Sequence, residues 1–218
     1  MARLTMPAAG MSVAALILLT ACGGGGGDNG SDKIQPTQTS TPVATASASP
    51  TASASSTVKR LVITFPAGAK MVYEDQHTGD QKKDAILADE SHANDSAYAA
   101  ILEGKNRTPA MEFYNSGLAL RGAADFVQGW LDKDNTWIGT VRYFDRKVTL
   151  RSDGSAVVIS CSDESRAFVK SRKTGKVDNT PTTADSYVLY NERLQKNPQG
   201  VWILVSVLSN RGAKECRP

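Results

Sequence analysis

The spacing of apolar residues changes once along this chain, near Thr136, and this change limits the fold more than any other feature. Before Thr136, apolar residues recur with the 3.6-residue period of an amphipathic helix. After it, they alternate with polar residues, as in strands that bury one face. Helices followed by strands predict an α+β domain, in which helices pack on a curved antiparallel sheet of about five strands.

Two helices are predicted before the change. The first follows a turn that ends at Asp80, a plausible N-cap, and stops at Gly104. The second begins at Thr108-Pro109, because a capping threonine followed by proline at the first helical position is typical of a helix start. Its apolar stripe continues to Leu131.

The strands form an antiparallel meander. Alternation starts at Trp137 and continues beyond a turn at Asp153-Gly154. The clearest hairpin joins Tyr187–Lys196 to Val201–Asn210. Upstream of both helices, Leu61–Phe65 is β-prone and is followed by proline, so it is either an edge strand or an extended lead-in.

The N-terminus is arranged as a secretion signal that ends in Leu19-Thr20-Ala21-Cys22. Its apolar run, Met11–Leu19, is about half the length that a membrane-spanning helix needs. The order of these four residues resembles a bacterial lipobox, which predicts a lipoprotein signal peptide over residues 1–21 and a diacylglyceryl group on Cys22. An ordinary secretory signal with a chance cysteine is the alternative. Two acyl chains hold a protein stably on a membrane, so the outer face of the cytoplasmic membrane is the predicted location.

Residues 22–57 consist almost entirely of Gly, Ser, Thr, Ala and Pro. Such a composition buries too little apolar surface to form a core, so this segment is predicted to be a disordered linker. Residues 58–218 remain, a length suited to one domain. The formal net charge of +3 does not favour a nucleic-acid partner.

Three cysteines are present in all, and two remain once Cys22 is assigned to lipid. An even pair in an oxidising compartment predicts a disulfide between Cys161 and Cys216. Two separate cysteines and two histidines lack the usual spacing of metal ligands, so neither a metal nor a cofactor is predicted.

The region from about Tyr73 to the C-terminus resembles a family of secreted lipoproteins of high-GC Gram-positive bacteria with an NTF2-like (SnoaL-like) domain. The stretches that carry the resemblance are TGDQKKDAILAD (78–89), GTVRYFD (139–145), CSDES (161–165), KTGKV (173–177) and SYVLYNERLQKNPQGVW (186–202). The family has no assigned activity, so no functional residue is carried over from it. The resemblance implies a cone of helices and curved sheet, with a cavity between them in many members of the wider fold.

Four aromatic residues are candidates for lining such a cavity: Tyr98, Tyr114, Trp137 and Tyr143. The competing interpretation is that they are core residues with polar tips bonded at its rim. Enzymes of the wider fold use an aspartate base with tyrosine donors in this place. Asp125 is the one helix-borne acid near the predicted inward face, and we expect it at the surface or in a structural hydrogen bond. His77 and His92 lie off the apolar stripe.

A basic stretch between two strands is a candidate for anion contact, through Arg166, Lys170, Arg172, Lys173 and Lys176. Each basic group near an anionic lipid surface contributes about 1 kcal/mol, so the stretch could orient the domain on a membrane. The alternative is a solvated hairpin tip, whose charge neighbouring acidic residues offset.

These observations favour a membrane-anchored lipoprotein whose domain is a non-enzymatic module that binds a small apolar ligand or a protein of the cell envelope. A cavity enzyme of the isomerase or cyclase type is the first alternative. A structural envelope protein with a filled cone is the second. The volume inside the cone distinguishes them, because a filled cone excludes both small-molecule interpretations.

Overall fold

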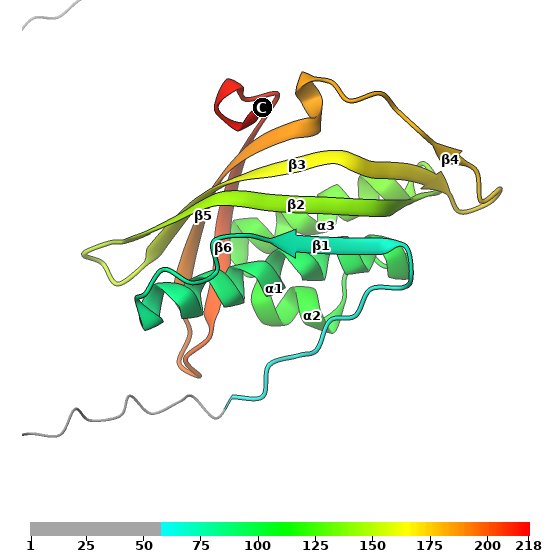
Figure 1. Cartoon of the computed structure of the whole chain (residues 1–218). Coiled ribbons are helices and arrows are strands. Elements are labelled where there is room, and N and C mark those ends of the chain that lie inside the picture. Colours follow the sequence, from blue (N-terminus) through cyan, green and yellow to red (C-terminus); the bar gives the residue numbers. More distant parts are fainter. Residues whose placement is uncertain (1–57) are drawn as a thin grey trace, which may run out of the picture. The chain divides into compact units, whose positions relative to one another are not determined.

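The computed structural model describes residues 58–218 (Figure 1). The predicted signal peptide, the lipid site at Cys22 and the linker therefore lie outside the described residues. The described part is an α+β domain in which three helices lie on one face of a curved sheet. The order of helices before the main strands agrees with the sequence prediction.

The sheet is mixed rather than wholly antiparallel. Four long strands pair antiparallel in the order β2-β3-β5-β6, and their bounds are Asn135–Leu150, Ala156–Ser171, Tyr187–Lys196 and Trp202–Arg211. A short strand, β4 (Val177–Asp178), pairs with β3. The other edge is β1 (Ala69–Tyr73), which runs parallel to β2. The helices lie between β1 and β2 in the chain and provide the long connection that parallel pairing requires.

Of the two alternatives for Leu61–Phe65, the structure shows the extended lead-in. The strand starts later, at Ala69, after a turn closed by the bond from the Ala69 amide to the Pro66 carbonyl (3.2 Å). The lead-in is held by Arg60, whose guanidinium makes two bonds to the buried Asp89 carboxylate (2.6 and 3.0 Å).

The first helix, α1 (Gln81–Glu103), has the predicted ends. The Asp80 side chain accepts bonds from the amides of Lys82 and Lys83 (2.8 and 3.1 Å), as an N-cap does. Gly104 closes the other end in the left-handed conformation (φ 72°), which glycine adopts without steric cost.

The predicted second helix is wrong in one respect, because it is two helices, α2 (Pro109–Tyr114) and α3 (Gly117–Leu131). The start at Thr108-Pro109 is as predicted, with the Thr108 hydroxyl accepting from the Met111 amide. Asn115 then takes an extended conformation and bonds through its amide side chain to Ser96 and to the Met111 carbonyl (3.0 Å each). The next amide, that of Ser116, bonds to the Leu204 carbonyl on β6 (2.9 Å), which joins this break to the sheet.

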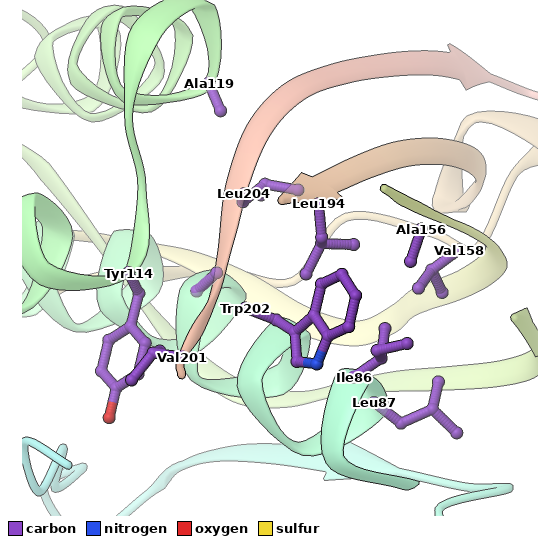
Figure 2. Close-up of a cluster of buried hydrophobic side chains, with 11 residues drawn as sticks. Ile86, Leu87, Tyr114, Ala119, Ala156, Val158, Leu194, Val201, Trp202 and Leu204 are labelled. Carbon is purple, nitrogen blue, oxygen red and sulfur yellow. The ribbon is translucent and has the colours of Figure 1, made fainter. Parts of the chain in front are cut away.

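A core of buried side chains fills one end of the space between helices and sheet (Figure 2). Trp202 is 2% exposed and lies among Leu194, Ala156 and Val158 of the sheet and Ile86 of α1. A second cluster, at the other end, contains Met111, Ile101, Val127, Val141 and Trp137.

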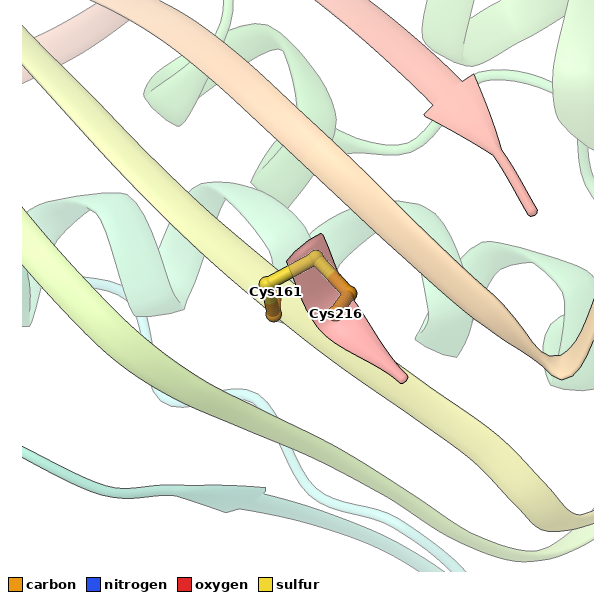
Figure 3. The surroundings of a disulfide bond; sticks show 2 residues. All are labelled: Cys161 and Cys216. Atoms are coloured by element: carbon orange, nitrogen blue, oxygen red, sulfur yellow. A yellow bond between two sulfur atoms is a disulfide. The ribbon is translucent and has the colours of Figure 1, made fainter. Parts of the chain in front are cut away.

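The face of the sheet away from the helices carries the disulfide. Cys161 on β3 is bonded to Cys216 in the C-terminal turn η2 (Lys214–Cys216), as predicted (Figure 3). Phe144, Tyr187 and Leu189 pack against it. Since neighbouring strand residues point to opposite faces, Phe144 faces this cluster while Tyr143 faces the helices.

Strand β2 contains a glycine, Gly139, at a position that leaves no room for a side chain. Gly139 has φ 104°, and a Cβ at this position would collide with the backbone oxygen of Arg166 on β3. The register between β2 and β3 shifts directly afterwards, between Thr140 and Arg142, and again between Phe144 and Lys147. Bulges of this kind increase twist and curve a sheet.

Candidate functional site

Two adjoining cavities lie on the helix side of the sheet. The first, here called the helix–sheet cavity, has a volume of about 480 Å³. The second, called the aromatic cavity, has a volume of about 510 Å³. Tyr98, Phe126 and Arg211 line both cavities and form their common border.

Small and apolar side chains from two helices and two strands line most of the helix–sheet cavity. They include Ala97 on α1, Leu118, Ala119, Gly122 and Ala123 on α3, and Val188, Leu204 and Val207 on the strands. Its polar groups are mainly the hydroxyls of Tyr98, Tyr143 and Tyr190 and the amides of Asn94 and Asn115. Within the described chain, no carboxylate, histidine or lysine lines this cavity.

The aromatic cavity has a different lining. Four aromatic residues, Tyr98, Phe126, Trp130 and Trp137, form one part of it. The loop before β5 forms another part, through Thr180, Pro181, Thr183, Asp185 and Ser186. Glu164 and Arg211 complete its charged residues.

One chain of polar contacts crosses the border between the cavities. The Tyr98 hydroxyl donates to Glu164 Oε1 (3.3 Å), and the Arg211 guanidinium donates to both oxygens of the same carboxylate (2.7 and 3.3 Å). Arg211 also donates to the carbonyl of Asp185 (2.6 Å). Glu164 is thus already paired with a cation.

The tyrosines in the helix–sheet cavity are suited to donate hydrogen bonds rather than to exchange protons. Burial raises the pKa of Tyr98 and Tyr143 well above the ordinary value of 10.0, and it also raises that of Tyr190. Tyr143 lies between two other rings, stacked on Tyr73 (5.2 Å between ring centres) and tilted against Tyr190 (5.7 Å). All of these phenols stay protonated at neutral pH.

The structure brings together three of the four aromatic candidates. Tyr98 lines both cavities, Trp137 lines the aromatic cavity, and Tyr143 lines the helix–sheet cavity. Tyr114 lies apart in the core with Trp202, and its hydroxyl bonds to the Leu61 carbonyl (3.1 Å). Asp125 is exposed at the surface of α3, where we expected it.

The histidines lie away from both cavities. His77 is exposed before α1. His92 is half-buried and stacks on Tyr114 (5.2 Å), and burial lowers its pKa. Neither side chain reaches a cavity wall.

One residue of the basic stretch is held by hydrogen bonds within the domain. Arg172 binds the C-terminal end of α1, donating to the carbonyls of Ile101 and Leu102, and also donates to the Asn135 carbonyl (3.0 Å). It therefore satisfies helix carbonyls that would otherwise lack partners, which is a structural role. Arg166, Lys173 and Lys176 are exposed, and Lys170 is partly buried on β3.

Sequence analysis missed a buried charged cluster beside the cavities. Arg146 on β2 donates to Glu90 and Ser91 on α1, and the side chains of both Arg146 and Glu90 are fully buried. Asn94 donates to the other Glu90 oxygen (2.7 Å). Glu192 on β5 is also fully buried, and neither of its oxygens has a hydrogen-bond partner among the described residues. Burial, followed by the nearby Glu90 charge, raises the pKa of Glu192 well above its usual range.

Asp95 on α1 is a second acid with a perturbed pKa. The Tyr73 hydroxyl donates to Asp95 Oδ1 (2.7 Å), and burial raises the pKa of this carboxyl to about 6. The Tyr73 hydrogen bond opposes the shift without cancelling it. Asp95 lines neither cavity, so its proton cannot reach a molecule bound there directly.

Within residues 58–218, no group of three or more His, Cys, Asp or Glu side chains is arranged to hold a metal ion. No helix there has both the length and the apolar character needed to cross a membrane.

No protein-family model and no curated protein matches the chain. Two solved structures show a distant likeness. The intermembrane-space region of chloroplast protein ARC6 is 12% identical, with a TM-score of 0.38, over 57% of this chain and 92% of that one. A ketosteroid isomerase-like protein from Erwinia carotovora atroseptica is 15% identical, with a TM-score of 0.39, over 61% and 97%. At these TM-scores neither likeness decides the fold family or the function.

Proposed function

We propose that this chain is a membrane-anchored lipoprotein of the cell envelope whose NTF2-like domain binds a small, largely apolar molecule without transforming it. The observation that carries the proposal is the helix–sheet cavity, with a volume of about 480 Å³ and a lining of small apolar side chains, tyrosine hydroxyls, two amides, Ser209 and the Arg211 guanidinium. Ligand sites are usually of this size and combine an apolar wall with a few polar groups.

Acid–base chemistry is disfavoured by the same lining. A cavity enzyme of the isomerase type needs a base within hydrogen-bond reach of its substrate. Among described residues, no such base lines the helix–sheet cavity, and Asp125 faces solvent. Glu164 at the border already accepts hydrogen bonds from Arg211 and Tyr98, so its oxygens are engaged.

A purely structural protein with a filled interior is disfavoured by volume. The packed core around Trp202 occupies one end of the space, but the end near Tyr98 is open. This space is partly open to solvent, since Leu118 (65% exposed) and Phe126 (40% exposed) stand at its wall, and side chains do not fill it.

The anchor rests on Leu19-Thr20-Ala21-Cys22 and on the polar segment that follows. It would place the domain on a tether at the outer face of the cytoplasmic membrane, where ligands or envelope partners are within reach. Mass spectrometry of the mature N-terminus tests the anchor. We expect a diacylated Cys22 as the first residue, and release of a Cys22→Ala protein from the membrane fraction. A mature terminus elsewhere rejects the anchor and leaves the cavity proposal intact.

Ligand binding is tested with a filled-cavity variant. Gly122 on α3 lines the helix–sheet cavity and has open space where a side chain would project. Gly129, on the same helix, also has open space but lies outside this cavity. The full chain in maltoside micelles is titrated with 1-hexanol by calorimetry, with protein-free micelles as the baseline.

We expect hexanol to bind the natural chain and the Gly129→Leu control alike, and to bind Gly122→Leu more weakly. Heats equal to the baseline for the natural chain would reject ligand binding in this cavity. Equal affinities for the two leucine variants would show that hexanol binds elsewhere.

A further inference from the structure

One part of the aromatic cavity is a wall of four aromatic rings. Tyr98 meets Phe126 and Trp137 edge to face (5.8 and 5.5 Å between ring centres), and Phe126 meets Trp130 in the same way (6.4 Å). The Trp137 indole nitrogen is already used, because it donates to the Tyr98 carbonyl (3.0 Å). The Tyr98 hydroxyl is used by Glu164. What these two residues offer a ligand is therefore mainly π surface.

The charged groups of the cavity favour a cation. Its charged lining residues are two acids, Glu164 and Asp185, and one base, Arg211. Arg211 donates to Glu164 and to the Asp185 carbonyl, which uses three of its five N–H donors and leaves fewer for an anion. Glu164 keeps accepting capacity, because a carboxylate has about four lone-pair sites. Arg211 bonds to the backbone carbonyl of Asp185 rather than to its carboxylate.

From these contacts we infer that the aromatic cavity holds the ammonium group of an organic cation, whose apolar part extends past Phe126 into the helix–sheet cavity. Rings of Trp, Tyr and Phe attract alkylated ammonium groups through their electron-rich faces. Phe126 is 40% exposed and lines both cavities, so it stands where the two parts of such a ligand would join. The inference rests on the proposed function and adds the charge class of the ligand.

Three probes that share the same hexyl tail and differ in their head groups test this inference. Hexyltrimethylammonium, hexyl sulfate and 1-hexanol are titrated into the full chain in maltoside micelles, with protein-free micelles as the baseline. The micelles are the same for each probe, so the ratio of affinities reports the head group. We expect hexyltrimethylammonium to bind at least about threefold more tightly than 1-hexanol, and hexyl sulfate to bind more weakly than either.

Two variants separate charge from packing. Glu164→Gln leaves Arg211 without its carboxylate, so the affinity for hexyltrimethylammonium falls roughly fivefold while that for hexyl sulfate rises. Trp130→Leu removes one aromatic wall and lowers the affinity for hexyltrimethylammonium about threefold more than that for hexanol. A merely misfolded variant would lose all three probes together. Glu112→Gln, at an exposed ion pair with Arg107, is the matched control and keeps the natural ratios.

Each outcome decides one question. If hexanol binds and the trimethylammonium head brings no gain, the cation inference is overturned and the proposed function stands. If none of the three probes binds, the proposed function fails as well. A gain for hexyltrimethylammonium that survives both Glu164→Gln and Trp130→Leu would place the head group outside the aromatic cavity and overturn the inference.

Discussion

Replacing the buried Glu192 by glutamine should remove a loss of stability that this protein suffers between pH 4.5 and neutral pH. Two carboxyl groups, those of Glu90 and Glu192, share a fully buried environment with one cation, Arg146. Arg146 and Asn94 bond to Glu90. Glu192 has no hydrogen-bond partner among the described residues, and burial raises its pKa well above 4.5. A buried carboxylate beside the negative charge of Glu90 is expensive, so Glu192 is expected to be protonated in the folded state.

The magnitude follows from linkage. A group whose pKa is raised on folding contributes to the free energy of unfolding. This contribution is fully present at pH values below the pKa of the unfolded state, and it is lost as the pH rises through the pKa of the folded state. For Glu192 the loss begins near pH 4.5 and proceeds at about 1.4 kcal/mol per pH unit. Between this point and neutral pH it reaches at most about 3 kcal/mol. Glutamine does not titrate, so the Glu192→Gln variant avoids the loss.

Urea unfolding of the full chain at pH 4.5 and at neutral pH provides the assay. The glutamine amide has a cost of its own, but this cost is the same at both pH values and cancels in the difference. We expect the free energy of unfolding of Glu192→Gln, relative to the natural chain, to be up to about 3 kcal/mol higher at neutral pH than at pH 4.5. The exposed Glu112→Gln variant should show no such change. A pH-independent difference for Glu192→Gln would mean that Glu192 is ionised when folded, and the reasoning would be refuted.

Two further perturbations test the sheet and its C-terminal closure. Gly139→Ala should destabilise the fold by more than about 3 kcal/mol, because its Cβ meets the Arg166 carbonyl. The control, Gly129→Ala on α3, should be neutral or slightly stabilising. Equal melting temperatures of the two variants would contradict the close approach of the strands at Gly139. Reducing Cys161–Cys216 opens a loop of 55 residues and should cost about 4 kcal/mol, measured as a lower melting temperature. Thiol labelling of both cysteines in the denatured, unreduced protein would contradict the bond.

Features that depend on neighbouring residues in the chain were predictable. The caps at Asp80 and Gly104 act within one turn of α1, and the hairpin of β5 and β6 is closed by a short turn. The break between α2 and α3 was also readable in principle. Asn115-Ser116-Gly117 is a run of turn-forming residues, but the apolar stripe on either side of it suggested one continuous helix.

Features that depend on distant residues were not predictable. The parallel strand β1 pairs with a strand about 70 residues later, and no local pattern indicates this partner. The burial of Glu90 was missed because a charged residue is not expected on an apolar stripe. Its spacing was a signal, since Glu90 lies four residues before Asn94 and eight before Tyr98, on the same side of α1. Its burial depends on Arg146, which a bulge in β2 turns toward the helices.

The helix–sheet cavity exists because α3 lacks side-chain volume where it faces the sheet. Ala119, Gly122 and Ala123 stand at the cavity wall, while the larger Leu118 is 65% exposed. Across from them, α1 is held by Arg146 and Glu90 and cannot move inward to close the space without breaking a buried ion pair. The open volume therefore results from the small residues on α3, which lie opposite α1, a helix held by its ion pair to the sheet. This arrangement favours a ligand site over an imperfectly packed core.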